Sequence, residues 1–144
     1  MSKPETIFEE LCQHVRKTSY LESTSALLEW DQQTKLPPKA GQYRSEQITF
    51  MAGQIHKRRT DPRLGELIGE LADSPLAQDK HSDVGATIAD LKRDYDKRVK
   101  LPVSLVESLA RSASVGQNLW VEARKENDFK KFAPQLKQLS LIHI

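Results

Sequence analysis

Apolar side chains recur along this chain at the three- and four-residue spacing of amphipathic helices. The first such stripe consists of Phe8, Leu11, Cys12 and Val15. A second stretch, 20–33, has the same periodicity, but Ser23-Thr24-Ser25 lowers the helix propensity there, and the sequence leaves open whether the two stretches form one helix. Pro37 and Pro38 must then end the helix, because neither donates an amide proton and Pro38 restricts the residue before it.

Further helical segments follow the double proline, and none of the chain has the strict alternation of a β-strand. Asp61-Pro62 supplies an N-cap and a first-turn proline for a short helix, and Asp128 is expected to cap the last helix, which tolerates Pro134 only with a kink or a late start. The expected helices after the double proline are 42–59, 62–71, 84–100, 103–127 and a last one over about 129–139. The prediction is an all-α fold of about six amphipathic helices.

The composition narrows the classes of partner. Lys and Arg number 22 and Asp and Glu 20, so the net charge of +2 indicates no charge-driven binding to nucleic acid or membrane. The longest apolar runs are too short to span a bilayer. Cys12 is the single cysteine, which excludes an internal disulfide and fits a reducing compartment. We therefore expect a cytoplasmic protein that binds neither membrane nor nucleic acid.

The residue types that carry most enzyme chemistry are missing or isolated. The four histidines are far apart in sequence, and the motif His-Glu-x-x-His, whose histidines bind one ion from one helix face, does not occur. The nucleophile elbow and the glycine-rich phosphate loops are also absent. The basic run 56–59 followed by Arg63 is a possible phosphate contact, but it lies at a predicted helix C-terminus, where cations complement the dipole anyway. We predict no catalytic residue and no metal ligand in this chain.

The candidate substrate-groove residues are Trp30, Asp31 and Gln32. Asp31 and Gln32 form a polar helix end just before the double proline, and such an end faces either a groove or water. Trp30 and Trp120 lie on apolar helical stripes, so packing in a core is the favoured interpretation and stacking on a substrate is the alternative. On the same grounds we expect Cys12 to be a buried, inert thiol.

Five stretches resemble, in order, the N-terminal part of the carboxypeptidase Taq family, the thermostable metallocarboxypeptidases. They are 26–38 (ALLEWDQQTKLPP), 44–47 with 51–53 (RSEQ, MAG), 60–67 (TDPRLGEL), 95–102 (YDKRVKLP) and 120–129 (WVEARKENDF). Together they cover roughly residues 5 to 139. Each stretch alone is weak, but five in register carry the resemblance.

The resemblance implies the N-terminal part of a larger all-helical metallopeptidase whose helices line a deep groove. Family members remove C-terminal residues from peptides with broad specificity, and they hold zinc or cobalt through both histidines of His-Glu-x-x-His and a downstream Glu. No position of this chain matches that motif, so no residue is assigned as catalytic or metal-binding, and the chain alone is expected to be inactive. The resemblance also implies a homodimer with peptide as substrate.

Two further expectations concern the organisation of the chain. Residues 1–139 are expected to form the N-terminal helical region of such an enzyme, and 140–144, an apolar tail without a cap, are expected to be a non-native or truncated end. The alternative function is a stand-alone helical interaction module that binds a partner helix or groove through its apolar stripes. Apolar helix faces that lack their partners should leave hydrophobic surface exposed.

Overall fold

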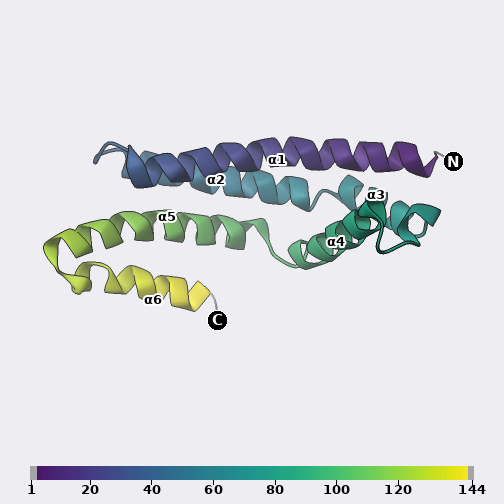
Figure 1. Cartoon of the computed structure of the whole chain (residues 1–144). Helices are drawn as coiled ribbons and strands as arrows, with labels where there is room; N and C mark the ends of the chain where they lie inside the picture. Colours follow the sequence, from purple (N-terminus) through teal and green to yellow (C-terminus); the bar gives the residue numbers. More distant parts are fainter. Residues whose placement is uncertain (1–2, 143–144) are drawn as a thin grey trace. The chain divides into compact units, whose positions relative to one another are not determined.

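The structure is a computed structural model that describes residues 3–142, and within that range it is helical with no β-strand. The all-α prediction is confirmed. The α-helices are α1 (Pro4–Thr34), α2 (Gly41–Arg59), α3 (Pro62–Ala72), α4 (Asp83–Arg98), α5 (Val103–Glu126) and α6 (Ala133–Ile142), with 3-10 turns at Pro75–Ala77 and Phe129–Lys131 (Figure 1). None of the described helices combines the length and the apolar character that crossing a membrane requires.

The first two predicted helical stretches form the single helix α1. Hydroxyl side chains fit inside it because they donate back to carbonyls one turn earlier: Thr18 Oγ1 to His14 O at 3.0 Å and Ser19 Oγ to Val15 O at 3.2 Å. The helix ends where expected. The amides of Lys35 and Leu36 both donate to Asp31 O at 2.9 Å before the double proline turns the chain.

Local capping determines most of the other helix ends. Asp61 accepts from the amide of Arg63 at 2.9 Å and caps α3, as predicted. Asp128 caps the 3-10 turn at Phe129–Lys131 rather than the last helix itself, since α6 begins only at Ala133. Pro134 thus lies in the first turn of α6, where a residue needs no intrahelical amide hydrogen bond. Of the two predicted alternatives, a kink or a late start of the helix, the structure has the late start.

The chain divides into two compact units, each of which takes part of α1 and part of α2. The first unit consists of residues 1–21 and 55–102. Its hydrophobic core is a cluster of buried side chains from α1, α3 and α4: Leu11, Leu64, Leu67, Ile68, Leu71 and Ile88. The buried His56 ring, at the end of α2, lies 2.8 Å through Nε2 from the carbonyl of Leu101, which ties α2 to the segment after α4.

The second unit consists of residues 22–54 and 103–144 and has a different interior. Ile48 is the one large apolar side chain that is buried among its described residues. The other buried side chains are small or polar: Ser25, Ser45, Thr49, Ser112, Ser114 and Ala123. Contacts within this unit therefore depend more on hydrogen bonds than on apolar packing.

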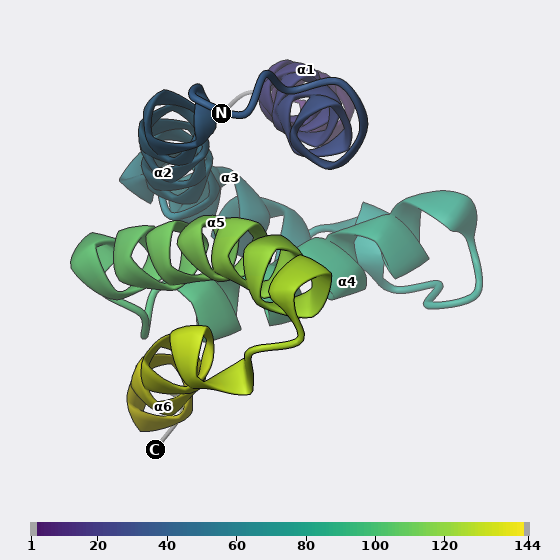
Figure 2. The same cartoon turned by 90° about the vertical axis from the view of Figure 1, so that its left-hand side faces the viewer.

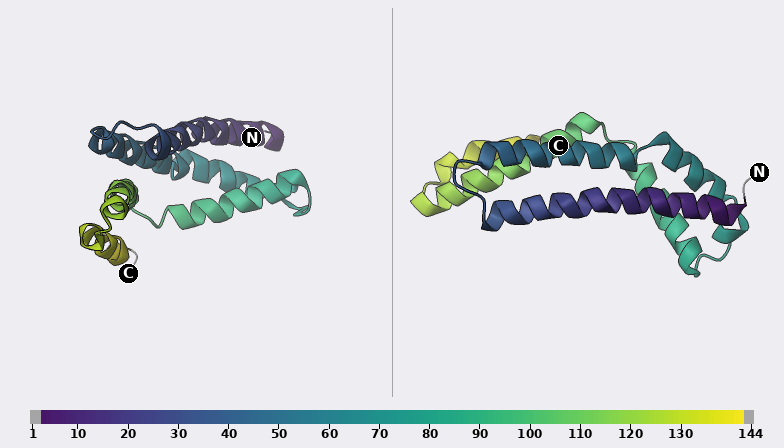
Figure 3. Two further views of the ribbon diagram at one scale, coloured as in Figure 1. Left: turned by 60° about the vertical axis from the view of Figure 1, so that its left-hand side comes forward. Right: turned by 90° about the horizontal axis from the view of Figure 1, so that it is seen from above.

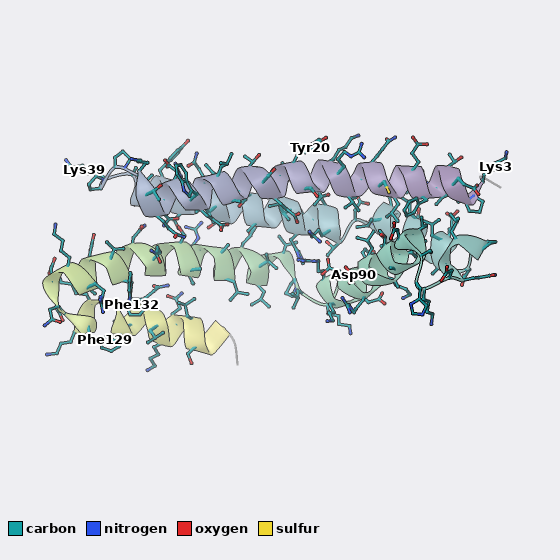
Figure 4. All side chains as sticks on the ribbon, viewed as in Figure 1. Lys3, Tyr20, Lys39, Asp90, Phe129 and Phe132 are labelled. Atoms are coloured by element: carbon teal, nitrogen blue, oxygen red, sulfur yellow. The ribbon has the colours of Figure 1, made fainter. Side chains whose placement is uncertain are left out.

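Two antiparallel helix pairs make up the second unit. The end of α1 and the start of α2 run side by side in opposite directions (Figure 3), and α5 and α6 form a hairpin (Figures 1 and 2). Phe129 and Phe132 meet edge to face at the turn of the hairpin, with ring centroids 6.3 Å apart (Figure 4). Gln135 Nε2 on α6 donates to Ser112 O on α5 at 3.0 Å. The α5–α6 hairpin thus carries both an aromatic and a polar contact.

The tail expected at residues 140–144 is part of the last helix as far as the structure describes it. Residues 140–142 continue α6, whereas 143 and 144 lie outside the described residues. The assignment of 140–144 as a non-native or truncated end stays a prediction.

Candidate functional site

An arginine clamp holds the corner between α1 and α2 in the second unit. Arg44 Nη1 forms an ion pair with Asp31 Oδ2 at 2.7 Å and donates to the carbonyl of Leu28 at 2.7 Å. Arg44 Nε donates to Gln47 Oε1 at 2.9 Å. The arginine side chain is only 13% exposed, so it binds three acceptors in a largely dehydrated setting. Asp31, a candidate groove residue, therefore holds the helix corner.

Gln32, the next candidate, turns toward α5. Its Nε2 donates to Ser114 O at 3.0 Å and to Asn118 Oδ1 at 3.1 Å, and its Oε1 accepts from Ser114 Oγ at 3.0 Å. Both ends of the carboxamide are thus engaged with one helix. Asp31 and Gln32, adjacent in sequence, connect α1 to α2 and to α5 respectively.

These contacts border a hollow of about 620 Å³. The last turn of α1, the double-proline connection, the first turn of α2 and one face of α5 surround it. Its lining residues are Gln32, Gln33, Thr34, Leu36, Pro37, Pro38, Lys39, Gly41, Gln42, Gln117, Asn118, Val121, Glu122 and Lys125. Of the three candidate residues, Gln32 lines this hollow and Trp30 and Asp31 do not.

The lining offers hydrogen bonding and charge. Five lining side chains are carboxamides. The charged lining residues are Lys39, on the connection (Figure 4), Lys125 and one acid, Glu122. Such a surface suits hydrogen bonding to a polar ligand. It contains no serine, cysteine or histidine that could act as a nucleophile or base.

Both tryptophans are exposed, which overturns the interpretation that they pack in a core. Trp30 is 58% exposed and Trp120 44% exposed. The Trp120 ring instead lies against the guanidinium of Arg124, whose Cζ is 5.7 Å from the ring centroid. The second unit therefore leaves both tryptophan side chains exposed.

The basic residues at the end of α2 form hydrogen bonds and ion pairs within the first unit. His56 binds Leu101 O, Arg58 Nε donates to Thr18 Oγ1 at 3.2 Å, and Arg59 pairs with Asp94 at 2.8 Å. Arg63 pairs with Glu10 and Glu66 on the surface. Most of these cations therefore stabilise the fold, as expected for a helix C-terminus.

Asp94 in α4 pairs with two arginines, one from α2 and one from its own helix. It accepts from Arg98 Nε, one helical turn later, at 2.6 Å and from Arg59 Nη1 at 2.8 Å. Burial by itself raises the pKa of the Asp94 carboxyl, but the hydrogen bond and charge of Arg98 and the charge of Arg59 outweigh it and hold the pKa below its usual value. Elsewhere in the chain, Glu126 pairs with Lys131, and the Glu107 side chain lies beside Gly53.

Comparison with known proteins identifies the family. The family model for carboxypeptidase Taq (M32) metallopeptidases matches residues 10–143. The chain belongs to this family. Thermostable carboxypeptidase 1 of Thermus thermophilus is 36% identical over 136 residues, which is 94% of this chain and 27% of that protein. Carboxypeptidase 1 of Bacillus subtilis is 27% identical over 125 residues, 87% of this chain and 25% of that protein.

Solved structures agree with this assignment. The crystal structure of BsuCP matches with a TM-score of 0.87 at 27% identity, over 95% of this chain and 27% of that one. The structure of CHT matches with a TM-score of 0.64 at 34% identity, over 91% and 26%. The chain thus spans about a quarter of the length of the M32 relatives it matches.

The described residues do not fit the metal that a metallopeptidase family implies. Between residues 3 and 142 no three His, Cys, Asp or Glu side chains gather where they could hold an ion. His81, the nearest to a cluster in sequence, is exposed, and its amide donates to Asp79 Oδ1 at 2.9 Å.

Sequence reasoning missed the residues that complete the site. Arg44 stood in one of the five family-like stretches, but its pairing with Asp31 depends on how α2 returns along α1. Asn118 and Ser114 gave no signal, because a polar residue inside an amphipathic helix ordinarily faces water. The exposure of Cys12, which is half-buried, is also higher than the sequence predicted.

Proposed function

We propose that this chain forms the N-terminal helical part of a metal-dependent carboxypeptidase that releases C-terminal residues from peptides with broad specificity. The observation that carries the proposal is the family match over residues 10–143, together with the alignment to a quarter of two carboxypeptidases. In this proposal the chain supplies one wall of the substrate groove, and residues outside it supply the metal centre.

The chain alone is proposed to be inactive. Metallopeptidases use a bound ion to lower the pKa of a water molecule so that it attacks the peptide bond near neutral pH. The family motif His-Glu-x-x-His does not occur in the 144 residues. The ion of the full-length enzyme, zinc or cobalt, would therefore be held by residues that this chain does not contain.

The three groove candidates take different parts in this proposal. Asp31 and Gln32 position the wall, because their hydrogen bonds join α1 to α2 and α5. Trp30, more than half exposed, offers an aromatic face for contact with a peptide. Gln32 is the one of the three that borders the hollow.

The wider setting is a cytoplasmic homodimer that acts on peptides and binds neither nucleic acid nor membrane. The single cysteine supports a reducing compartment. The exposed large apolar side chains of the second unit support association with further protein: Leu27, Trp30, Tyr43, Phe50, Trp120, Val121, Phe129 and Leu136. The internal pairing of the basic run supports the absence of nucleic-acid binding.

A chimera tests the proposal directly. The N-terminal quarter of Bacillus subtilis carboxypeptidase 1 is replaced by this chain, and release of the C-terminal amino acid from a short peptide is measured with zinc or cobalt. We expect metal-dependent release by the chimera and none above background by this chain alone. Release by the chain alone, or no release by a folded, monodisperse chimera beside an active parent enzyme, would overturn the proposal.

A further inference from the structure

A second hollow in the second unit collects hydrogen-bond donors without any acid. It measures about 390 Å³ and lies between the first turns of α2 and the middle of α5. Its lining residues are Gly41, Gln42, Ser45, Arg111, Val115, Asn118 and Leu119. Each polar group among them can donate, and no carboxylate is present.

The start of α2 contributes a positive helix end. The first amides of a helix have no acceptor within it, and the helix dipole adds partial positive charge there. The 19-residue helix α2 has no acidic residue in its first turn, and Gly41 and Gln42 of that turn line the hollow. By contrast, α4 begins with Asp83 and is capped by Ser82, so its end is already compensated.

The buried Ser45 hydroxyl is a second, independent observation that points to a ligand in this hollow. The residue is 2% exposed, and its Oγ has no hydrogen-bond partner among the described residues. A buried hydroxyl without a partner is costly, and such groups in native proteins point to a bound water or ion as the partner. Ser45 lies one turn into α2, on the wall of this hollow.

Asn118 and Arg111 complete the set of donors from α5. Gln32 donates to Asn118 Oδ1, so the Asn118 amide nitrogen is left free to face α2; Nδ2 lies 2.8 Å from the point that a Cβ on Gly41 would occupy. Arg111 is exposed and has no ion pair within the described residues, because Glu107 reaches toward Gly53 instead.

We infer that this hollow binds a small oxyanion, a carboxylate or phosphate group, between the N-terminus of α2 and Arg111. The anion accepts hydrogen bonds from the first-turn amides, from Asn118 Nδ2 and from the Ser45 hydroxyl, while the Arg111 guanidinium supplies the charge. This site is separate from the proposed peptidase activity, and its binding is measurable on the 144-residue chain alone.

The test is an NMR titration of the ¹⁵N-labelled chain with inorganic phosphate and, in a second arm, acetate, against chloride at matched ionic strength. We expect saturable shifts of the Gly41, Gln42 and Ser45 amides and of the Asn118 side-chain amide, with none at Asp83 on the capped α4. Tighter phosphate binding assigns the site to phosphate groups, and tighter acetate binding assigns it to carboxylates. Shifts that do not saturate, or that also occur at Asp83, would overturn the inference.

Variants separate the site from general charge screening. Arg111→Gln should weaken binding about tenfold, because a charged donor is lost. Arg16→Gln, an exposed arginine in the first unit, should leave the affinity unchanged. Ser45→Ala should weaken binding and, in anion-free buffer, melt no lower than the parent chain, since it removes an unpaired hydroxyl. Unchanged affinity in Arg111→Gln, or a lower melting temperature of Ser45→Ala in anion-free buffer, would contradict the site.

Discussion

Arg44 Nη1 lies 2.7 Å from Asp31 Oδ2 and also 2.7 Å from the carbonyl of Leu28, so one side chain binds both a carboxylate and a backbone carbonyl near the end of α1. Twelve residues, two of them prolines, separate Asp31 from Arg44 along the chain. The pair therefore closes the corner that shapes the hollow beside Gln32. A lysine at position 44 would keep the charge but could not reach all these acceptors in one plane.

Arg44→Lys should accordingly lower the free energy of unfolding by about 2 kcal/mol, because the partly buried acceptors on Gln47 and Leu28 lose their donor. The matched control is Arg93→Lys. Arg93 pairs with Asp90 on an exposed face, and there we expect a change within about 0.5 kcal/mol. Urea unfolding measures both, and equal effects of the two substitutions would show that Arg44 is not a clamp.

The glycines differ sharply in the space around them. A Cβ on Gly85 would lie 2.1 Å from the backbone oxygen of Asp79, which cannot move without breaking the turn before α4. A Cβ on Gly116 would lie 3.5 Å from Gln135 Cγ, an ordinary contact. Gly85→Ala should therefore lower the melting temperature clearly, whereas Gly116→Ala should leave it unchanged or raise it, since alanine favours helix by about 1 kcal/mol. A clear drop for Gly116→Ala would contradict the α5–α6 geometry.

Truncation of a leucine to alanine should cost much more stability in the first unit than in the second. Leu71 is fully buried in the core of the first unit, and Leu71→Ala should cost about 3 kcal/mol of unfolding free energy. Leu27 in the second unit is 67% exposed, and Leu27→Ala should cost less than about 1 kcal/mol. If Leu27→Ala proved as damaging as Leu71→Ala, the side chain would be covered in solution, for example by a second copy of the chain.

The pH dependence of stability should depend on Asp94. Arg98 and Arg59 keep the pKa of its carboxyl lower in the folded than in the unfolded chain. A lowered folded pKa contributes stability that is complete above the unfolded value of about 3.9 and is lost as the pH falls through the folded pKa. Asp94→Asn should therefore lower the melting temperature at pH 7, and the difference from the parent should shrink below about pH 4. A difference that stays constant from pH 7 to pH 3 would contradict this pairing.

Much of the fold could be predicted from local signals, because they act within a few residues. Asp61-Pro62 sets the start of α3, and the double proline ends α1 near Thr34. Periodicity showed that Phe8, Leu11 and Val15 share a face that packs in the first unit. These features need no knowledge of the rest of the chain.

The candidate site could be predicted only in part, because its contacts join distant residues. The polar helix end at Asp31 and Gln32 was visible in sequence, but Arg44, Ser114 and Asn118 were not. The exposure of Trp30 and Trp120 was also missed, since periodicity shows which side chains share a face and not whether anything covers that face. Fold was thus easier to infer than burial.

The contrast between the leucine-rich interior of residues 1–21 and 55–102 and the serine-lined interior of the rest has a thermodynamic consequence. Attraction between hydrocarbon groups weakens on cooling, whereas hydrogen bonds between amide, hydroxyl and guanidinium groups do not depend on temperature in that way. When amide hydrogen exchange is measured as the chain is cooled, the amides of Leu67 and Ile88 should therefore lose protection before those of Gln32 and Arg44.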